Sequence, residues 1–510
     1  MSILSQEITT TDTNDLLNGM KEVVDFVQSS VVEGRSAHEV EVGLWQRMLA
    51  MGRRAYGYFL GQSGDGDAGE AICLEAGRRL RRLEHRHIRE IRNVFGAFEL
   101  ERVVYGTREG QKIEHVPLDA RLQLPESKNS YLLQDWDQGL AVTMPYAEVN
   151  ATIERILGFK QSVHTLERDQ REMAKAQEAF WKEQPVPLAE DEGELLVATA
   201  DHKGIPMRGC GEAPAGPQPP SNRGMRPGTK KMALIGAVYT VDRHVRTPEE
   251  VLEALFRERP AADPRPTRPT PCFKHMRASL RPDGADSTEA QTQEIFSWMA
   301  QEAAQRNSGG KKPMVMLMDG QESLLTAGLK YLPETEETEV TDVLDLLHAL
   351  GYLWEAAHLF HPSGSAAAAA WVKEQARRML HGQIASVIQS LRWQGTHARL
   401  KGKALESLER ICGYFQSNSH RMAYDVYLEQ GFPIASGVIE GACRCVVKDR
   451  MERSGMRWVL SGARAMLNMR CISLSHLWDQ YIQFRIQRES ARLYPRYAAN
   501  DTDYCHPQAA

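Results

Sequence analysis

The stretch Glu194-Leu-Leu-Val-Ala-Thr-Ala-Asp201 is a short apolar run that closes on a carboxylate. A second run of this kind, Pro313-Met-Val-Met-Leu-Met-Asp319, has no charge before its final acid. Both have the length and apolar character of buried central strands, whose side chains are covered on both faces. An aspartate at the carboxyl end of such a strand points into the crevice where α/β sheets hold ligands. The two runs therefore predict a sheet with Asp201 and Asp319 at one edge.

A third acid, Glu440, lies far downstream in the run Ile434-Ala-Ser-Gly-Val-Ile-Glu-Gly-Ala442. This run predicts a helix that begins at Ser436 or Gly437. Two strand-end aspartates and one helical glutamate could hold two Mg²⁺ ions, which are hard cations that prefer carboxylate oxygen, with Mn²⁺ as the alternative ion. Such a pair activates one oxygen and stabilises another during an in-line phosphoryl displacement.

These residues resemble the DDE transposases of the ISKra4 group of bacterial insertion sequences, which carry a ribonuclease-H-like catalytic domain. The matching segments cover most of the chain after residue 190 and are Ala200-Asp-His-Lys-Gly-Ile-Pro-Met207, Met318-Asp-Gly-Gln321, Asp345-Leu-Leu-His-Ala-Leu-Gly-Tyr-Leu-Trp354 and Glu440-Gly-Ala-Cys-Arg-Cys-Val-Val-Lys-Asp-Arg-Met-Glu-Arg-Ser-Gly-Met-Arg-Trp458. The resemblance implies that Asp201, Asp319 and Glu440 are the catalytic acids and the metal ligands. It also implies that Asp345 and His348 form the Asp-x-x-His element that several transposases with long helical insertions place after the second aspartate.

Each of these residues also has a structural interpretation. A single aspartate before glycine, as at Asp319, is commonly a turn residue or a helix cap. Glu440 could favour a helix dipole from the first turn, and His348 could be a partly buried histidine with satisfied hydrogen bonds. Order, strand context and the resemblance favour a site for the three acids, whereas both interpretations stay open for Asp345 and His348. A functional His348 would orient a carboxylate or contact a phosphate, because imidazole is a poor ligand for Mg²⁺.

The composition is that of a large globular protein. At 510 residues, with 42% hydrophobic and 25% charged residues, the chain is too long for one ordinary domain. It has no run of eighteen apolar residues and no basic start followed by an apolar core, so we expect a cytoplasmic protein without a membrane partner. The resemblance implies that it is bacterial and associated with the nucleoid. Eight scattered cysteines fit a reducing compartment. Four tetrahedral zinc ligands are not visible, so the sequence does not establish a zinc site.

The net charge of −5 does not exclude a nucleic-acid partner, because the distribution of charge decides binding. Arginine dominates residues 78–92 and 444–470. A basic surface neutralises phosphates and gives an affinity that falls with salt. A solvated helix face explains the first cluster equally well. For the second, DNA binding is favoured, because four cations follow the predicted catalytic glutamate: Lys448, Arg450, Arg453 and Arg457.

Residues 145–168 predict two consecutive helices. The first runs from Pro145 and is closed by Gly158, and the second is capped by Ser162. Two helices joined by a short glycine-containing turn have the outline of a helix-turn-helix, in which three side chains of the second helix would face the major groove: His164, Thr165 and Arg168. An ordinary helical hairpin is equally compatible, and the position upstream of the catalytic acids favours recognition of DNA ends.

The predicted fold is an α/β ribonuclease-H-like core interrupted by an all-helical insertion. A mainly helical N-terminal region with a helix-turn-helix-like DNA-binding segment precedes it. The expected divisions are 1–130, helical with a β-hairpin near Val94–Tyr105; 131–190, helix-turn-helix-like; 191–360, first part of the core; 361–430, helical insertion; 431–494, second part with the glutamate helix; and 495–510, flexible tail. A glycine- and proline-rich loop is expected over residues 206–227.

The expected function is that of a DNA transposase. It would bind double-stranded DNA at the ends of an insertion sequence, cleave phosphodiester bonds and join the 3′ end to target DNA. Because two ends are cut together, a homodimer or higher oligomer is expected on symmetry grounds. A ribonuclease-H-like nuclease without joining activity would use the same acids. A DNA-binding protein descended from a transposase would not need them.

Overall fold

The computed structural model describes residues 13–74, 78–108, 110, 113–208, 230–257, 268–281, 288–332, 338–435, 437–453 and 455–495. Ser436 and the side chain of Glu440 lie outside this description, as do most of the expected 206–227 loop and the tail. The described chain is mostly helical with a five-stranded mixed sheet, which confirms the mixed α/β class. It divides into two compact units, Met1–Phe180 with Trp478–Ala510, and Trp181–Leu477.

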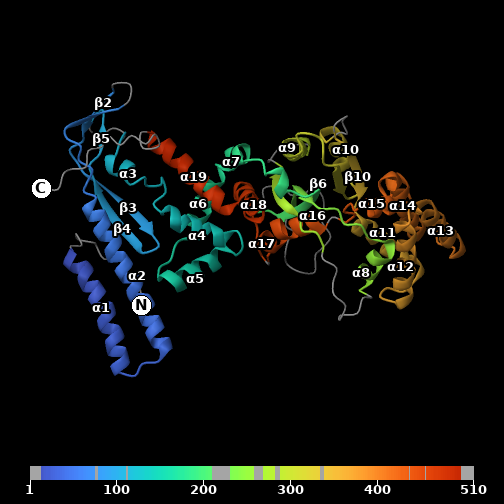
Figure 1. Cartoon of the computed structure of the whole chain (residues 1–510), viewed down its shortest axis with the longest axis horizontal. Helices are drawn as coiled ribbons and strands as arrows, with labels where there is room; N and C mark the ends of the chain where they lie inside the picture. Colours follow the sequence, from blue (N-terminus) through green and yellow to red (C-terminus); the bar gives the residue numbers. More distant parts are fainter. Residues whose placement is uncertain are drawn as a thin grey trace, which may run out of the picture. The chain divides into compact units, whose positions relative to one another are not determined.

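The N-terminal unit begins with two long helices that lie side by side (Figure 1). Its elements are α1 (Thr13–Val32), α2 (Ala37–Gln62), β1 (Ala71–Cys73), β2 (Arg79–Arg82), β3 (His87–Asn93), β4 (Gly96–Arg102), β5 (Tyr105–Gly106), α3 (Pro117–Arg121), α4 (Tyr131–Ala141), α5 (Tyr146–Leu157), α6 (Val163–Ala174) and α19 (Trp478–Leu493). The boundary between the two units falls within α7 (Gln177–Glu183). A capping box at Ser36 starts α2, because the Ser36 side chain accepts from the Glu39 amide and the Glu39 carboxylate accepts from the Ser36 amide.

A β-hairpin forms in this unit, but earlier than the sequence indicated. Strands β3 and β4 pair antiparallel, so Val94 and Phe95 form the turn rather than the first strand. The preceding segment has many charged residues and therefore lacks a clear alternation of apolar and polar residues. In β2 only Leu80 is buried, and the first residues of β3 are mostly exposed. The segments that form β1, β2 and most of β3 were therefore wrongly expected to be helical.

The last helix also departs from the expected divisions. The second part of the core was expected to run to residue 494, whereas α19 belongs to the N-terminal unit. Trp478 Nε1 of this helix donates to Asp135 Oδ1 of α4 at 2.7 Å, and the Tyr481 ring meets the Phe180 ring edge-on at 5.1 Å. The chain leaves this unit, builds the second one and returns.

The second unit is built on five strands in the order β10-β9-β6-β7-β8. They are β6 (Leu195–Pro206), β7 (Lys230–Val241), β8 (Cys272–Leu280), β9 (Met314–Met318) and β10 (Val340–Leu344). The first three strands pair antiparallel, and β9 and β10 run parallel to β6. The central strands β6, β7 and β9 have long runs that are buried on both faces, and helices cover both sides of the sheet.

Odd- and even-numbered residues of β6 and β9 face two different cores, one on each side of the sheet. On β6, Leu195 and Val197 join a core that includes the helices after β10, while Leu196 and Ala198 join a core with α9 and α10. Because successive side chains of a strand point to opposite faces, Asp201 has the parity of the first group. The same holds for Asp319, which follows Leu317 by two residues.

Helices make up the rest of this unit, and residues 361–430 are almost wholly helical (Figure 1). They are α8 (Pro248–Phe256), α9 (Glu289–Arg306), α10 (Glu322–Tyr331), α11 (Leu346–Phe360), α12 (Ala366–Leu380), α13 (Ile384–His397), α14 (Lys403–Asn418), α15 (Tyr424–Glu429), α16 (Gly437–Cys443), a π-helical turn (Arg444–Lys448), α17 (Asp449–Met451) and α18 (Leu460–Leu474), with short 3₁₀ turns at Ala189–Asp191 and Ser419–Arg421. Within the described ranges, none of the protein's helices is long and apolar enough to cross a bilayer.

Candidate active site

Asp201 and Asp319 lie level with each other on adjacent parallel strands. Ala198 of β6 is opposite Met316 of β9. Asp201 lies three residues after Ala198, and Asp319 lies three residues after Met316. Parallel neighbours lie about 4.8 Å apart, and the two acids share a face of the sheet. The sequence prediction of two carboxylates at one edge therefore agrees with the register of the strands.

Asp201 is inside β6 rather than at its end, which corrects the prediction. The strand continues to Pro206 because the long β7 supplies partners, with Ile235 opposite Asp201. On its other side β9 ends at Met318, one residue short of the level of Asp201. Asp201 therefore lies just beyond the end of β9, although its own strand continues.

Burial and charge act together on Asp319. Burial raises the pKa of the Asp319 carboxyl, and the neighbouring charge of Asp201 raises it further. The Gln321 backbone N–H, which donates to Asp319 Oδ1 at 3.0 Å, lowers that pKa, and the nearby histidines His348 and His202 act in the same direction. Two carboxylates thus lie close enough to disfavour ionisation of one of them.

His202 and Gln321 connect the two acids, although the sequence assigned them no role. The His202 backbone N–H donates to Asp201 Oδ1 at 2.6 Å. Its ring Nδ1 donates to Gln321 Oε1 at 3.1 Å, and Gln321 is the residue whose backbone holds Asp319. Both residues lie within the segments that carried the family resemblance, which was the one available signal.

Tyr414 brings the helical insertion to this site. A Cβ on Gly320 would overlap the Tyr414 ring, so glycine lets the ring lie directly against the turn after Asp319. Tyr414 stacks on Tyr352 of α11 with ring centroids 3.9 Å apart. Burial raises the pKa of the Tyr414 hydroxyl, and the Asp319 charge contributes to that shift, so the phenol is neutral at physiological pH. No sequence pattern pairs residues 320 and 414.

Arg421 ties the edge strand β10 and the turn after β9 to the insertion. Its fully buried guanidinium makes an ion pair with Asp342 of β10, with Nε and Oδ2 2.8 Å apart. Its Nη1 donates to Asn418 Oδ1 at 3.2 Å and to the Asp319 carbonyl at 3.4 Å. Through Arg421, the backbone at Asp319 is therefore linked to Asp342 of β10 and to Asn418 of α14.

Asp345 and His348 follow the next strand, β10. Asp345 is buried and caps α11, because its Oδ1 accepts from the Leu347 N–H at 3.1 Å. Its own N–H donates to the Met318 carbonyl at 2.9 Å, which places it beside the Asp319 turn. His348 is exposed on the first turn of α11, near the Tyr352 ring. The capping interpretation holds for Asp345, and its place next to the acids is compatible with a second role.

The helix of Glu440 packs against the strand of Asp201. Helix α16 contacts β6 and β7, and Ile439 and Ala442 are buried. The structure thus brings the third predicted segment to the same sheet, while the direction of the Glu440 side chain lies outside the described residues. Among the described residues, which do not include the Glu440 carboxylate, no three or more His, Cys, Asp or Glu side chains form a group that could hold a metal ion.

The cationic segment after Glu440 runs beside the end of β6. Trp458 N–H donates to the Pro206 carbonyl at 3.0 Å, and Arg208 N–H donates to the Trp458 carbonyl at 2.8 Å. Three of the four predicted DNA-binding cations are exposed, and they are Lys448, Arg453 and Arg457.

Arg450 is a correction to that set of cations. Its side chain is fully buried, with the guanidinium carbon 5.2 Å from the centroid of the Trp458 ring. A guanidinium in this position has no access to a DNA phosphate, so Arg450 has a structural role. The sequence could not separate it from its exposed neighbours, because the π-helical turn shifts which residues face inward.

The predicted recognition residues lie in the N-terminal unit. Helix α5 ends at Gly158 with φ +79°, and Ser162 caps α6 by accepting from the Thr165 N–H at 3.0 Å, so both predicted caps are confirmed. His164 and Arg168 are exposed and Thr165 is half-buried. Arg168 is 3.1 Å from the buried Asp169 carboxylate.

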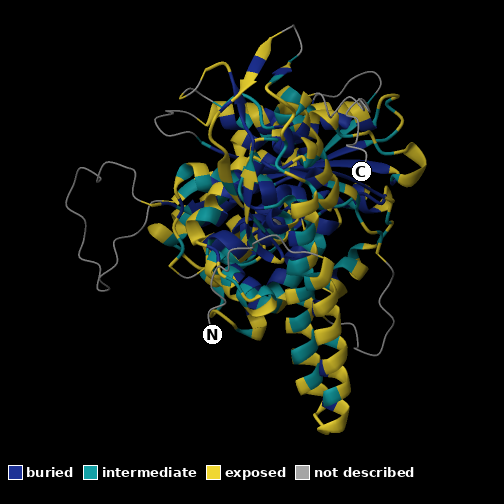
Figure 2. Cartoon of the chain, turned by 90° about the vertical axis from the view of Figure 1, so that its left-hand side faces the viewer, coloured by how far each residue is buried: buried dark blue, intermediate teal, exposed yellow. Residues whose placement is uncertain are grey.

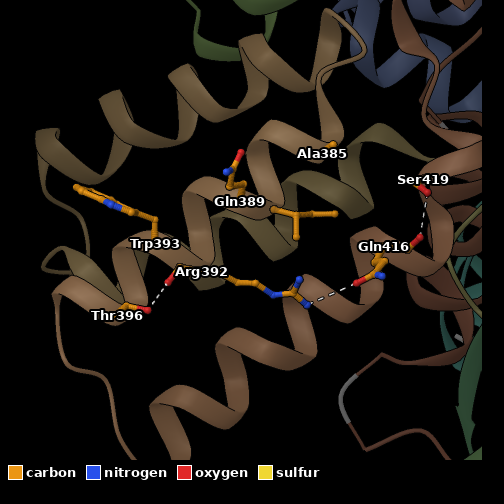
Figure 3. Close-up of a pocket in the computed structure, with 8 residues that line it drawn as sticks. Ala385, Gln389, Arg392, Trp393, Thr396, Gln416 and Ser419 are labelled. Atoms are coloured by element: carbon orange, nitrogen blue, oxygen red, sulfur yellow. Dashed lines mark hydrogen bonds between the residues drawn. The ribbon is translucent and has the colours of Figure 1, made fainter.

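A separate pocket of about 580 Å³ lies between α13 and α14 (Figure 3). Arg392 and Trp393 line it, and Arg392 reaches toward Gln416. None of the predicted site residues lines it. The pocket is therefore separate from the pair of aspartates at the sheet edge.

Comparison with protein-family models found none that matches this chain. None of the curated proteins compared with it has significant sequence similarity.

Proposed function

We propose that this protein is a DDE-type DNA transposase, similar to those of ISKra4 insertion sequences, with a ribonuclease-H-like catalytic core. The observation that carries the proposal is the placement of Asp201 and Asp319 level on adjacent parallel strands, close enough for one charge to raise the pKa of the other. The sheet supports the fold assignment, since three antiparallel strands are followed by two strands parallel to the first. The packing of the Glu440 helix on β6 and β7 supports the third acid.

Asp201 and Asp319 are suited to hold a divalent cation, and Glu440 would complete a site for two ions. Two carboxylates held together repel each other when ionised, and a hard cation between oxygen ligands relieves that repulsion. Asp201 would share the ions, while Asp319 and Glu440 would each hold one. When bound, Mg²⁺ ions supply activation of the attacking oxygen and stabilisation of the leaving oxygen.

The chain's own residues orient the acids and the DNA. The Gln321 and His202 backbone amides fix one oxygen of each aspartate, which leaves the second oxygen of each for a ligand. Tyr414 closes one side of the Asp319 turn. Exposed cations beside the end of β6 would bind substrate phosphates, and they are Lys448, Arg453 and Arg457.

The proposed reaction has two steps in one site. Water attacks the phosphorus at the end of the insertion sequence, and the bond to the 3′ oxygen breaks to leave a 3′ hydroxyl. That hydroxyl then attacks a target phosphorus, a new phosphodiester bond forms, and the target's own 3′ oxygen leaves with a proton. Helix α6 would recognise the ends, and two copies of the chain would act on a pair of ends.

Metal-dependent cleavage tests the catalytic assignment. Labelled DNA carrying the genomic flanks of the gene would be incubated with Mg²⁺ and wild type, Asp201→Asn, Asp319→Asn or Glu440→Gln. We expect end-specific nicking by wild type and a loss of at least about a thousandfold in each variant, with unchanged DNA binding. Glu406→Gln, an exposed acid of α14, is the matched control and should cleave normally. Undiminished cleavage by Asp319→Asn would refute the assignment.

A further inference from the structure

Helix α1 has two different apolar faces. One packs on α2: Phe26 and Gly19 are buried, and a Cβ on Gly43 of α2 would overlap the Phe26 ring. The other is exposed, and its members lie alternately three and four residues apart. They are Leu17, Met20, Val24, Val27 and Val31, each between 38% and 78% exposed. In Figure 2 the α1–α2 hairpin, at the bottom of the view, is coloured almost entirely as exposed or intermediate.

The spacing of this stripe is that of a coiled-coil seam. A three-four alternation repeats every seven residues and keeps the side chains on one line along the helix. Leu17, Val24 and Val31 take the first apolar position of the heptad, and Met20 and Val27 take the second. A branched valine at the first position is a feature of two-stranded seams. Here the second position holds the unbranched Met20 and the branched Val27. Single exposed apolar residues are ordinary, whereas a continuous stripe of this kind indicates a contact surface.

The stripe fits a second copy of itself. It contains no charged residue, while Glu22 and Asp25 take heptad positions away from it. Lys21 is the one charged residue among the five positions that flank the seam, which are Leu16, Lys21, Val23, Gln28 and Ser30. A two-fold axis at Val24, the midpoint of the stripe, would place Lys21 opposite uncharged side chains whether the helices run parallel or antiparallel. Two-fold interfaces join the same patch on both subunits, which requires this kind of self-complementarity.

We propose that α1 pairs with α1 of a second copy of this chain along the stripe Leu17–Val31, and that this contact makes the protein a dimer. The stripe spans two heptads, so the dimer should dissociate on dilution rather than be permanent. The inference goes beyond the proposed catalytic function. Helix α1 carries none of the predicted site residues, so the dimer and the chemistry are tested separately.

Sedimentation of the full-length protein at about 1 to 100 μM tests the contact, because that range brackets a micromolar dissociation constant. Wild type should move from monomer to dimer across the range. Val24→Glu and Val27→Glu should raise the dissociation constant at least tenfold, because each places a charge in the seam. Val32→Glu is the matched control, since Val32 is 88% exposed on the same helix outside the stripe, and it should dimerise as wild type does. Thermal unfolding of each variant checks that it is folded.

Cross-linking identifies the surface. With a short bismaleimide, Val24→Cys should give a covalent dimer well above the level from the native cysteines, and Val32→Cys should not. A wild type that is monomeric throughout, seam variants that dimerise unchanged, or a Val24→Cys yield equal to that of Val32→Cys would each overturn the proposal. Dimerisation that appears only when residues 1–12 are deleted would also overturn it, because the stripe would then be covered by the chain's own N-terminus.

Discussion

At the scale of single residues, the ionised Asp319 carboxylate lowers the free energy of unfolding because of its surroundings. A carboxyl whose folded pKa is raised binds its proton more tightly in the native state than in the unfolded state. Stability is then greatest below the unfolded pKa and falls as the pH rises through the folded pKa. Burial and the Asp201 charge are the causes, so the cost is present at neutral pH.

We therefore predict that Asp319→Asn stabilises the protein at pH 7. The amide keeps an acceptor for the Gln321 N–H and removes the charge, which should add about 1 kcal/mol to the free energy of unfolding. The gain should vanish near pH 3, where the wild-type carboxyl is protonated in both states. Urea unfolding at the two pH values measures it.

Mg²⁺ should make the wild-type protein more stable than Asp319→Asn. If the acids hold the ion, millimolar Mg²⁺ raises the wild-type melting temperature and leaves Asp319→Asn nearly unchanged, because a ligand that binds only the native state stabilises it. Equal shifts in both proteins would show that Asp319 is not a ligand.

The contact of Gly320 with Tyr414 gives a second residue-scale prediction. Gly320→Ala forces a methyl group into the Tyr414 ring and should cost about 1 to 3 kcal/mol of stability. Combining it with Tyr414→Ala should recover part of that loss in a double-mutant cycle. Gly413→Ala is the control: its Cβ would meet open space inside α14, so that variant should be as stable as wild type or more so. Additive losses in the cycle would contradict the contact.

How much of the site the sequence predicts depends on the kind of interaction. Asp201 and Asp319 were visible because each ends or interrupts a strongly apolar run. Tyr414 and Arg421 were not, because their roles depend on tertiary contacts with residues about 100 positions away. The burial of Arg450 was missed because its assignment rested only on its position after Glu440, and a position in the sequence does not show which residues around a π-helical turn face inward.

At the scale of elements, α11 depends on its N-cap. Asp345→Ala should cost about 1 kcal/mol, the usual value of a lost cap, while Asp345→Asn keeps an acceptor for the Leu347 N–H and should lose little. Chemical denaturation compares the two. A loss of DNA cleavage in Asp345→Asn at normal stability would give Asp345 a role in the site beyond capping.

Helix α6 makes a separate prediction for DNA. In a recognition helix, His164→Ala and Arg168→Ala should each weaken binding to the end sequence by about tenfold and leave binding to unrelated DNA nearly unchanged. Glu167→Gln, exposed on the same helix, is the control. Equal losses on both DNAs would mean that α6 contacts only the backbone or is part of an ordinary helical hairpin.

Element boundaries were predictable where caps or apolar runs define them. Gly158 marks the end of α5 and Ser162 marks the start of α6, as expected, since both act through local geometry. The full length of β6 was not predictable, because the residues after Asp201 are held in the strand by β7, which begins at residue 230.

At the scale of the whole molecule, the chain builds two units and closes the first with its last helix. Trp478 and Tyr481 of α19 contact side chains and backbone of α4 and α6, so the N-terminal unit is incomplete without it. Composition gave no sign of this return, because α19 is an ordinary amphipathic helix whose partners are about 300 residues upstream. Truncation before Trp478 should therefore destabilise the N-terminal unit, which limited proteolysis would detect.

The joining reaction tests the central claim most directly, since cleavage alone is shared with nucleases. Wild-type protein would be mixed with Mg²⁺, end DNA from the genomic flanks and a target plasmid, and the junctions sequenced. We predict junctions in which the terminal 3′ nucleotide of the end DNA is covalently joined to the plasmid, with none formed by Asp201→Asn or Asp319→Asn. Efficient cleavage without junctions would identify a nuclease and contradict the transposase assignment.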